Sequence, residues 1–233
     1  MTNGLQFAAA YTWGHALADS GTTLSGSNGL NTLNGTNFNT SYTSASWDVR
    51  QSFTTQFNYD VPFGRGQKYG ANLNKIALVA LGNWHTNGIL SIRSGQPFTL
   101  TSSGCEYVSE NGFCGPQLIS GSPNAAPAGG RNPNEWFNTA NFGPEGSQGL
   151  SYGNVGLQTN VGPPTRTLDF SIFKDFAFTE RMKLQFRAEG TNVANTPQFS
   201  TPDNNQSDST FGKVTGTQAG SERHIQFALR LQF

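Results

Sequence analysis

The sequence predicts an all-β fold, and within that class an antiparallel transmembrane β-barrel segment of about six long strands with long extracellular loops. Three observations support this prediction. Charged residues make up 12% of the 233 residues, about half the roughly 25% typical of a soluble domain. Gly, Asn, Ser, Thr and Phe are abundant, which favours strands and turns over helices. Apolar and polar residues also alternate with a period of two in six separate blocks.

Charge and hydropathy exclude other classes. The 14 basic and 14 acidic residues cancel, whereas a nucleic-acid partner requires a surplus of positive charge. The longest apolar run, Ile76 to Leu81, is far shorter than the roughly 18 residues of a membrane helix. Residues Met1 to Phe7 lack the basic and apolar regions of a secretory signal peptide. Either the chain stays inside the cell, or its true start is missing.

The first three blocks lie in the N-terminal half of the chain. Odd-numbered apolar residues from Leu5 to Trp13 alternate with Gln, Ala and Thr, and Phe53 to Val61 alternate with residues such as Gln56. The third block, 84–93, has the same pattern, although Ile89 interrupts its polar face. Each block has the length and alternation of a strand with two different environments.

The last three blocks are 167–172, 182–191 and 224–233. Because lipid offers no hydrogen-bond partners, a β protein crosses a bilayer only as a closed barrel, with strands of about 9 to 11 residues. Alternating side chains then point into lipid and into a wet lumen. The residues expected to face lipid are Leu168, Phe170, Ile172, Leu184 and Phe186. Those expected to face the lumen are Asp169, Lys183, Gln185, Arg187, Glu189 and Arg230.

Short and long connections alternate between the blocks. A structureless insert as long as 101–165 is improbable inside a compact soluble domain, but outer-membrane barrels combine short periplasmic turns with long extracellular loops. We therefore expect residues 19–48, 101–165 and 196–221 on the extracellular side, and 63–83 and 178–180 on the periplasmic side.

One periplasmic connection has a helical pattern. Residues 74–81 predict a short amphipathic helix, with Asn72 or Asn74 as its N-cap.

Catalytic and metal motifs are weak. The string Gly149 to Gly153 matches a nucleophile elbow but lies in a Gly-rich loop, where the required strand-to-helix turn is not expected. His15, His85 and His224 belong to different blocks, and so predict neither a zinc site nor a Ser/His pair. The sequence therefore predicts a protein that is not an enzyme, with no catalytic residues, cofactor or metal.

Cys105 and Cys114 are the only two cysteines, and both lie in the longest loop. An even count in an exposed loop predicts a disulfide and an oxidising compartment. The alternative is two unpaired thiols in a cytosolic chain.

Four stretches carry a family resemblance: Tyr11 to His15 followed by Asp19, Asp60 to Gly66, Trp84 to Phe98, and Leu168 to Asn195. In order and spacing they resemble the C-terminal part of the barrel of TonB-dependent receptors, in particular the Oar-like group. Ala194 departs from the pattern, since that position is usually aromatic. The ending resembles the terminal strand read by the barrel assembly machinery. The resemblance implies an assembly signal at Ile225, Phe227, Leu229, Leu231 and Phe233.

The resemblance also implies a location and a set of partners. Intact relatives lie in the outer membrane of Gram-negative-type cells, take up or bind a nutrient, and close about 22 strands around a plug. Residues 1–233 would then be the C-terminal portion of such a barrel, a fragment not competent for energised import alone. Its partners would be outer-membrane lipid, the barrel assembly machinery, and the remaining strands and plug, with TonB engaged through the missing N-terminal part.

Two other hypotheses remain open from the sequence. One is a small stand-alone or oligomeric outer-membrane barrel, or an adhesin-like barrel. The other is a soluble secreted β-sandwich, in which the polar faces would simply point to solvent. The sequence does not name a substrate under any of these hypotheses.

Overall fold

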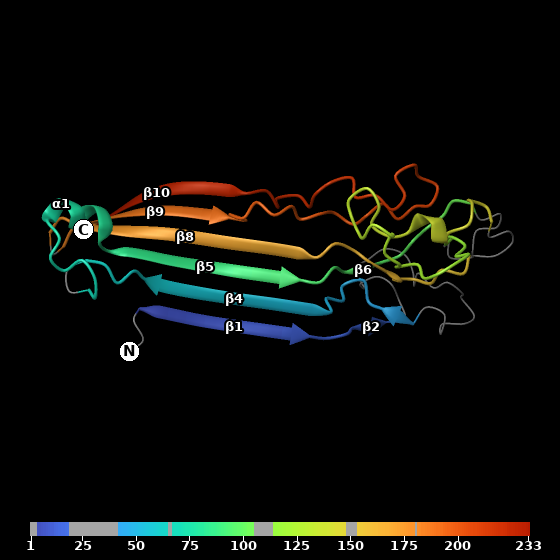
Figure 1. Cartoon of the computed structure of the whole chain (residues 1–233), viewed down its shortest axis with the longest axis horizontal. Coiled ribbons are helices and arrows are strands. Elements are labelled where there is room, and N and C mark those ends of the chain that lie inside the picture. Colours follow the sequence, from blue (N-terminus) through green and yellow to red (C-terminus); the bar gives the residue numbers. More distant parts are fainter. Residues whose placement is uncertain (1–3, 19–41, 65–66, 105–113, 148–152, 180) are drawn as a thin grey trace.

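A computed structural model describes residues 4–18, 42–64, 67–104, 114–147, 153–179 and 181–233. Six long strands lie side by side, with the helix α1 at one end and the large loops at the other (Figure 1). The described part of the three long loops gathers at the end opposite α1, while the C-terminus lies at the α1 end. This grouping confirms which loops share an end. No helix in the described ranges is long and apolar enough to cross a membrane.

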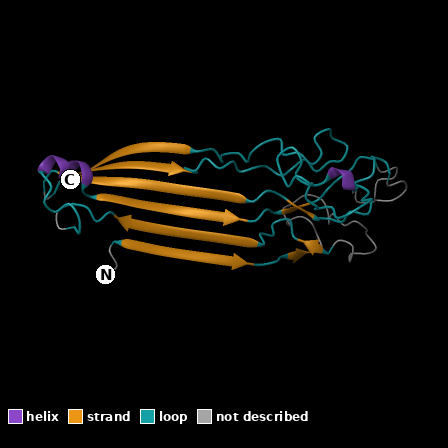
Figure 2. Cartoon of the chain, viewed as in Figure 1, coloured by secondary structure: helices purple, strands orange, loops and turns teal. Residues whose placement is uncertain are grey.

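The main sheet is antiparallel, and each strand pairs with its neighbours in chain order (Figure 2). It is open, with β1 and β10 at its edges. The prediction of six long antiparallel strands is confirmed. The strands are β1 (Leu5–Trp13), β4 (Gln51–Asp60), β5 (Trp84–Arg93), β8 (Thr165–Ala177), β9 (Lys183–Thr191) and β10 (His224–Gln232).

Smaller elements lie in the loops. Two ribbons pair β2 (Leu17–Ala18) with β3 (Thr43–Ser44), and β6 (Pro97–Phe98) with β7 (Asn160–Val161). A 3-10 helix, η2, spans Thr139–Asn141. The sequence analysis predicted none of these elements.

Strand β8 has 13 residues, so the predicted bounds 167–172 were too short. Its alternation is interrupted after Ile172, where Phe173 takes a polar-face position and Lys174 an apolar-face position, and it resumes at Asp175. Each of the two residues is packed against its neighbours. The guanidinium of Arg187 lies 4.8 Å from the ring centre of Phe173, and Lys174 is only 4% exposed.

The predicted rim helix is confirmed as α1 (Lys75–Leu81). Asn74 is its N-cap, with a side-chain oxygen that accepts a 2.8 Å hydrogen bond from the backbone N–H of Ala77. Two strand residues hold the other end of the helix. Trp84 Nε1 donates to the Ala80 carbonyl at 3.1 Å, and Lys174 Nζ donates to the Gly82 carbonyl. These bonds fix α1 to the ends of β5 and β8.

Changing Lys174 to methionine should loosen α1, because the ammonium is lost while the apolar stem is kept. A hydrogen bond to a charged group contributes about 1.5 to 3 kcal/mol, so amide hydrogen exchange in α1 should become roughly 10- to 100-fold faster. Mass spectrometry of the exchanged protein would measure this. The matched control is Lys183→Met, since Lys183 is an exposed lysine at the start of β9. Unchanged exchange in α1 would contradict the role of Lys174.

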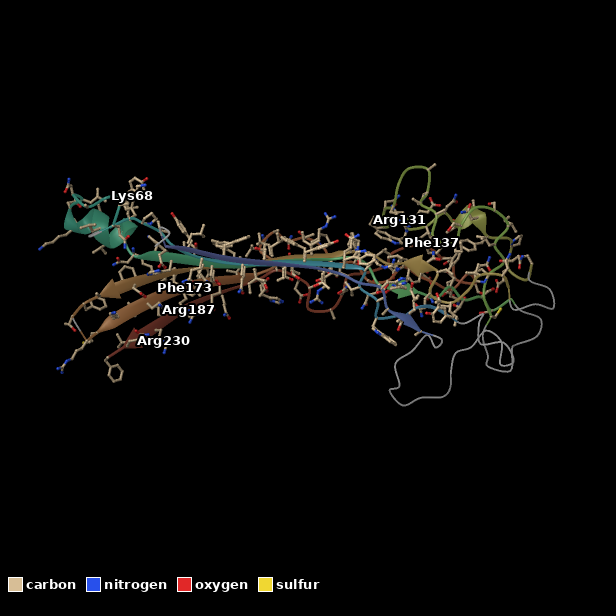
Figure 3. The ribbon with its side chains drawn as sticks, turned by 90° about the horizontal axis from the view of Figure 1, so that it is seen from below. Lys68, Arg131, Phe137, Phe173, Arg187 and Arg230 are labelled. Carbon is tan, nitrogen blue, oxygen red and sulfur yellow. The ribbon has the colours of Figure 1, made fainter. Side chains whose placement is uncertain are left out.

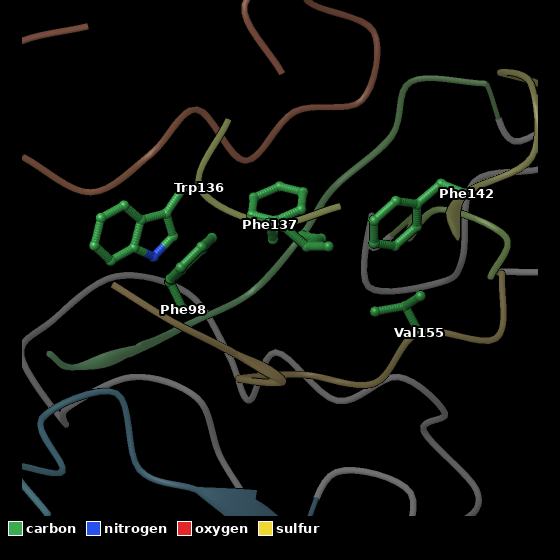
Figure 4. Packing of buried hydrophobic residues seen from close by; sticks show 6 residues of the cluster. Phe98, Trp136, Phe137, Phe142 and Val155 are labelled. Atoms are coloured by element: carbon green, nitrogen blue, oxygen red, sulfur yellow. The ribbon is translucent and has the colours of Figure 1, made fainter. Parts of the chain in front are cut away.

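At the opposite end, the described parts of the loops pack around a core of their own (Figure 4). We call this packed loop region the head. Phe137 and Leu100 are fully buried. The ring centre of Phe137 lies 5.9 Å from that of Phe142 and 5.2 Å from that of Phe211, and both pairs are edge-on. The long connections are therefore packed structure. The buried cluster comprises Phe98, Leu100, Trp136, Phe137, Phe142 and Val155, with Leu118, Phe211 and Val214 packed against it.

The head joins two loops that are distant in the sequence, the β5–β8 loop and the β9–β10 loop. The backbone N–H of Trp136 donates to the carbonyl of Gly212 at 2.8 Å, and the N–H of Thr101 donates to that of Asn204 at 2.8 Å. Asn204 Nδ2 returns a 2.7 Å bond to the Thr99 carbonyl. These bonds fasten one loop to the other.

Arg131 stabilises the head through contacts within the β5–β8 loop. Its guanidinium donates to the carbonyls of Trp136 at 2.9 Å and Asn124 at 2.6 Å, and lies 5.6 Å from the centre of the Trp136 ring. Burial lowers the pKa of Arg131 from its ordinary value, but an arginine side chain stays charged at physiological pH.

Candidate functional site

The strand register sorts the side chains of the sheet onto two faces. Residues directly opposite one another in an antiparallel ladder point to the same side. Gln185 lies opposite both Asp175 and Arg230, and Arg187 lies opposite Phe173. All the residues predicted to face the lumen fall on this side, which we call the polar face: Asp169, Lys183, Gln185, Arg187, Glu189 and Arg230.

The other side is the apolar face. Aromatic rings bridge its strands: the ring centres of Phe57 and Phe170 lie 6.4 Å apart, and those of Phe186 and Phe227 lie 6.2 Å apart and are stacked. Phe7 and Trp13 on β1 are each 66% exposed, which is unusual for large apolar side chains in water. The residues predicted to face lipid all lie here: Leu168, Phe170, Ile172, Leu184 and Phe186.

Polar contacts cross the strands on the polar face. His85 on β5 lies with Nδ1 2.6 Å from an Asp60 oxygen on β4, and with Nε2 4.0 Å from an Asp175 oxygen on β8. Gln185 on β9 donates to the other Asp175 oxygen at 2.9 Å. One row of contacts thus links four neighbouring strands, all near the α1 end of the sheet.

A second row of polar contacts joins β9 to β10. Arg187 NH2 contacts a Glu189 oxygen at 2.5 Å, and Gln226 donates to the second Glu189 oxygen at 2.8 Å. The stack of Arg187 on Phe173 extends this row to β8 (Figure 3). The alternation in the sequence assigned Asp60, Arg187 and Glu189 to the polar side of their blocks. It missed Phe173 and Asp175, which lie beyond the predicted end of their strand. In both rows the charged groups have polar or charged partners, as half-buried charges require.

Three of the predicted lumen residues have other surroundings. Asp169 accepts a 2.9 Å bond from the backbone N–H of Asn192, so it holds the chain where β9 ends. Lys183 and Arg230 are exposed on the polar face.

A cleft of about 700 Å³ opens where the polar face meets the loops. We call it the mouth cleft. Its described lining consists mainly of hydroxyl, amide and backbone groups, and Arg93 is the one charged side chain among them. Gln198 anchors one wall, since its side chain accepts a 2.8 Å bond from the Arg166 N–H and donates a 2.5 Å bond to the Arg166 carbonyl. Such a lining suits a polar ligand that carries hydroxyl or anionic groups.

The sequence analysis did not predict the mouth cleft, because its lining comes from four separate stretches of the chain. These are Ser46 to Val49, Ser91 to Pro97, Gly162 to Thr167, and Gln198 to Ser221. A concentration of Ser, Thr and Gln at strand ends was the available signal. It did not distinguish a cleft from ordinary loops.

The histidines are placed apart. His15 Nε2 lies 3.0 Å from the Ser44 hydroxyl in the loops, His85 lies on the polar face, and His224 Nε2 lies 3.4 Å from a Glu222 oxygen at the start of β10. Among the residues that the structure describes, no three His, Cys, Asp or Glu side chains form a group that could hold a metal ion. The string 149–153 lies mostly outside the described residues.

The cysteine prediction falls partly outside the described residues. Cys114 is buried in the head, and no cysteine in the described ranges has a free thiol. Cys105 lies outside those ranges, so the pairing of Cys105 with Cys114 stays a prediction.

The residues of the proposed assembly signal lie on the open edge of the sheet. Ile225, Phe227, Leu229 and Leu231 share the apolar face of β10 and are 52% to 71% exposed, and Phe233 follows at 96%. Their role in assembly stays a prediction.

Comparison with known proteins identifies one family. No curated protein and no solved structure matches the chain. A family model described as an outer membrane beta barrel domain matches residues 1–226, a range that includes five of the six long strands in full, the head and α1. Its description agrees with the two-faced antiparallel sheet. The chain therefore belongs to the outer membrane β-barrel domain family.

Proposed function

We propose that this domain is the C-terminal part of the barrel of a TonB-dependent, Oar-like receptor in a Gram-negative-type outer membrane, and that the complete receptor captures and imports a nutrient. The observation that carries the proposal is the mouth cleft, which lies beneath a packed head at the loop end of the polar face. Its place suits a molecule arriving from outside and passing into the lumen.

The arrangement supports binding and passage rather than catalysis. In this proposal the apolar face contacts lipid and the polar face lines a hydrated lumen, because charges such as Lys183 and Arg230 are costly to bury in a dry core. The edges at β1 and β10 pair with the remaining strands, since lipid cannot satisfy open backbone groups. The domain alone, without plug and TonB contact, does not import.

The proposal is tested by reading the genomic DNA upstream of the Met1 codon and then producing the complete protein encoded there. We expect an in-frame plug and earlier strands. We also expect the complete protein, purified in detergent, to retain the purified periplasmic domain of TonB on a column, while residues 1–233 alone do not. Absence of a plug, or a complete protein that fails to retain TonB, would overturn the receptor assignment.

The open edges favour a second candidate function. Two or more copies could pair β1 of one with β10 of another and form an oligomeric stand-alone barrel, which would remove the edges without further strands. Light scattering of the detergent-purified chain distinguishes the two candidates. A closed oligomer that resists urea supports the second, whereas a monomer or an irregular aggregate supports the receptor fragment.

A further inference from the structure

The α1 end of the sheet exposes an apolar surface. On α1 itself, Ile76 is 83% exposed, Val79 60% and Leu81 50%. Tyr69, Phe178 and Met182 are exposed large side chains of the neighbouring connections, at 53%, 63% and 40%. We call these six residues the rim surface. In water such a cluster is unfavourable, so it indicates a partner.

The rim surface is continuous with the apolar face of the sheet. Trp84 and Lys174 are directly opposite one another and belong to that face, and both donate hydrogen bonds to the last turn of α1. Lys174 also lies opposite Phe186, a member of the apolar face on β9. The helix is therefore docked on the apolar side, and the edge-on view shows α1 and Lys68 above the sheet, with Phe173, Arg187 and Arg230 below (Figure 3).

In the connection that contains α1, all the charged residues are basic. Residues 61–83 contain Arg65, Lys68 and Lys75 and no Asp or Glu, although the whole chain is balanced at 14 basic and 14 acidic residues. Lys68 Nζ lies 5.3 Å from the centre of the Tyr69 ring, so a cation and an aromatic ring stand together beside the helix. Apolar residues, an aromatic ring and lysines on one surface are the features of a segment that lies in a membrane interface.

We propose that the rim surface binds anionic phospholipid in the leaflet at the α1 end of the barrel. Ile76 and Val79 enter the boundary between head groups and acyl chains, while Lys68 and Lys75 contact lipid phosphates. Lipid is the occupant because the surface continues the face that the barrel family turns to the membrane, and because its positive charge is complementary to anionic head groups. The proposal requires the membrane location but not a TonB-dependent function.

The first experiment places a fluorophore on the helix. Ile76→Cys, made with both native cysteines changed to serine, is labelled with nitrobenzoxadiazole and reconstituted into vesicles of phosphatidylcholine and phosphatidylglycerol at 7:3. A spin-labelled phosphatidylglycerol should quench the probe about an order of magnitude more efficiently than spin-labelled phosphatidylcholine. The matched control is Lys213→Cys, an exposed lysine of the head, where neither lipid should quench. Absence of quenching at residue 76 would overturn the proposal.

The second experiment leaves the native cysteines intact. The preference for spin-labelled phosphatidylglycerol is measured by electron paramagnetic resonance in the unaltered chain, in Lys68→Gln/Lys75→Gln, and in Lys213→Gln. Each lysine near an anionic surface should contribute about a fivefold preference, so the double variant should lose the selectivity and Lys213→Gln should keep it. Selectivity that survives in the double variant would refute the head-group contacts. Neither result depends on whether the complete protein binds TonB.

Discussion

Replacing Phe137 by alanine is expected to lower the free energy of unfolding of the head by about 3 to 5 kcal/mol, the usual cost of removing a buried aromatic side chain. Phe137 is fully buried, and its ring contacts those of Phe98, Phe142 and Phe211. No other side chain of the cluster has three such ring contacts among the described residues. Amide hydrogen exchange, followed separately in the head and in the strands, would measure the effect.

The matched control for the head is Phe178→Ala, because Phe178 is 63% exposed at the opposite end of the sheet. We expect it to leave head exchange unchanged. If Phe137→Ala accelerated exchange equally in β4, β5 and the head, the two parts would unfold as one unit. That result would contradict the view of the head as a separate packed core.

An arginine at Phe186 should destabilise the membrane-inserted barrel by about 2 to 4 kcal/mol if it lies near the bilayer midplane. Phe186 lies on the apolar face and stacks on Phe227, so the new charge would enter lipid. Arginine at the adjacent Gln185 should have little effect, because that side chain lies on the polar face beside Asp175. Urea titration of the protein in vesicles would measure both variants.

The comparison of neighbours removes effects common to the strand, such as altered backbone propensity. The fraction that runs as a heat-modifiable folded band on a gel gives a second measure of assembly. Equal losses at positions 185 and 186 would contradict a strand with one lipid face and one wet face.

The alternation of polar and apolar residues was enough to predict the sheet. Strands β1, β4, β5, β9 and β10 lie within a residue or two of their predicted bounds, because each keeps its alternation along nearly its whole length, apart from Ile89 on the polar face of β5. Strand β8 was cut short at Ile172, since the periodicity is interrupted where Phe173 stacks on Arg187 and Lys174 binds the end of α1. Both exceptions depend on tertiary partners that a local pattern does not contain.

The head could not be predicted in this way. Its core draws Phe98 and Leu100 from one side of the longest loop, Trp136 and Phe137 from the middle of that loop, and Phe211 from another loop. These residues have no common period, and Gly, Pro and Asn separate them. A local pattern does not show that the two loops meet at the same end of the sheet. The mouth cleft was missed for the same reason, whereas the residues expected to share a face of the sheet do share one. Which face contacts lipid stays a prediction.

The bonds between the two head loops also bear on how the strands find their partners. Trp136 to Gly212 and Thr101 to Asn204 join the chain before β8 to the chain after β9. A head that forms first would therefore hold together the loop ends of four strands, β5, β8, β9 and β10, before the hydrogen bonds between these strands form. The entropic cost of bringing distant segments together rises with the logarithm of loop length, so these four strands would meet as a preassembled group whose register is set from the loop end of the sheet toward α1.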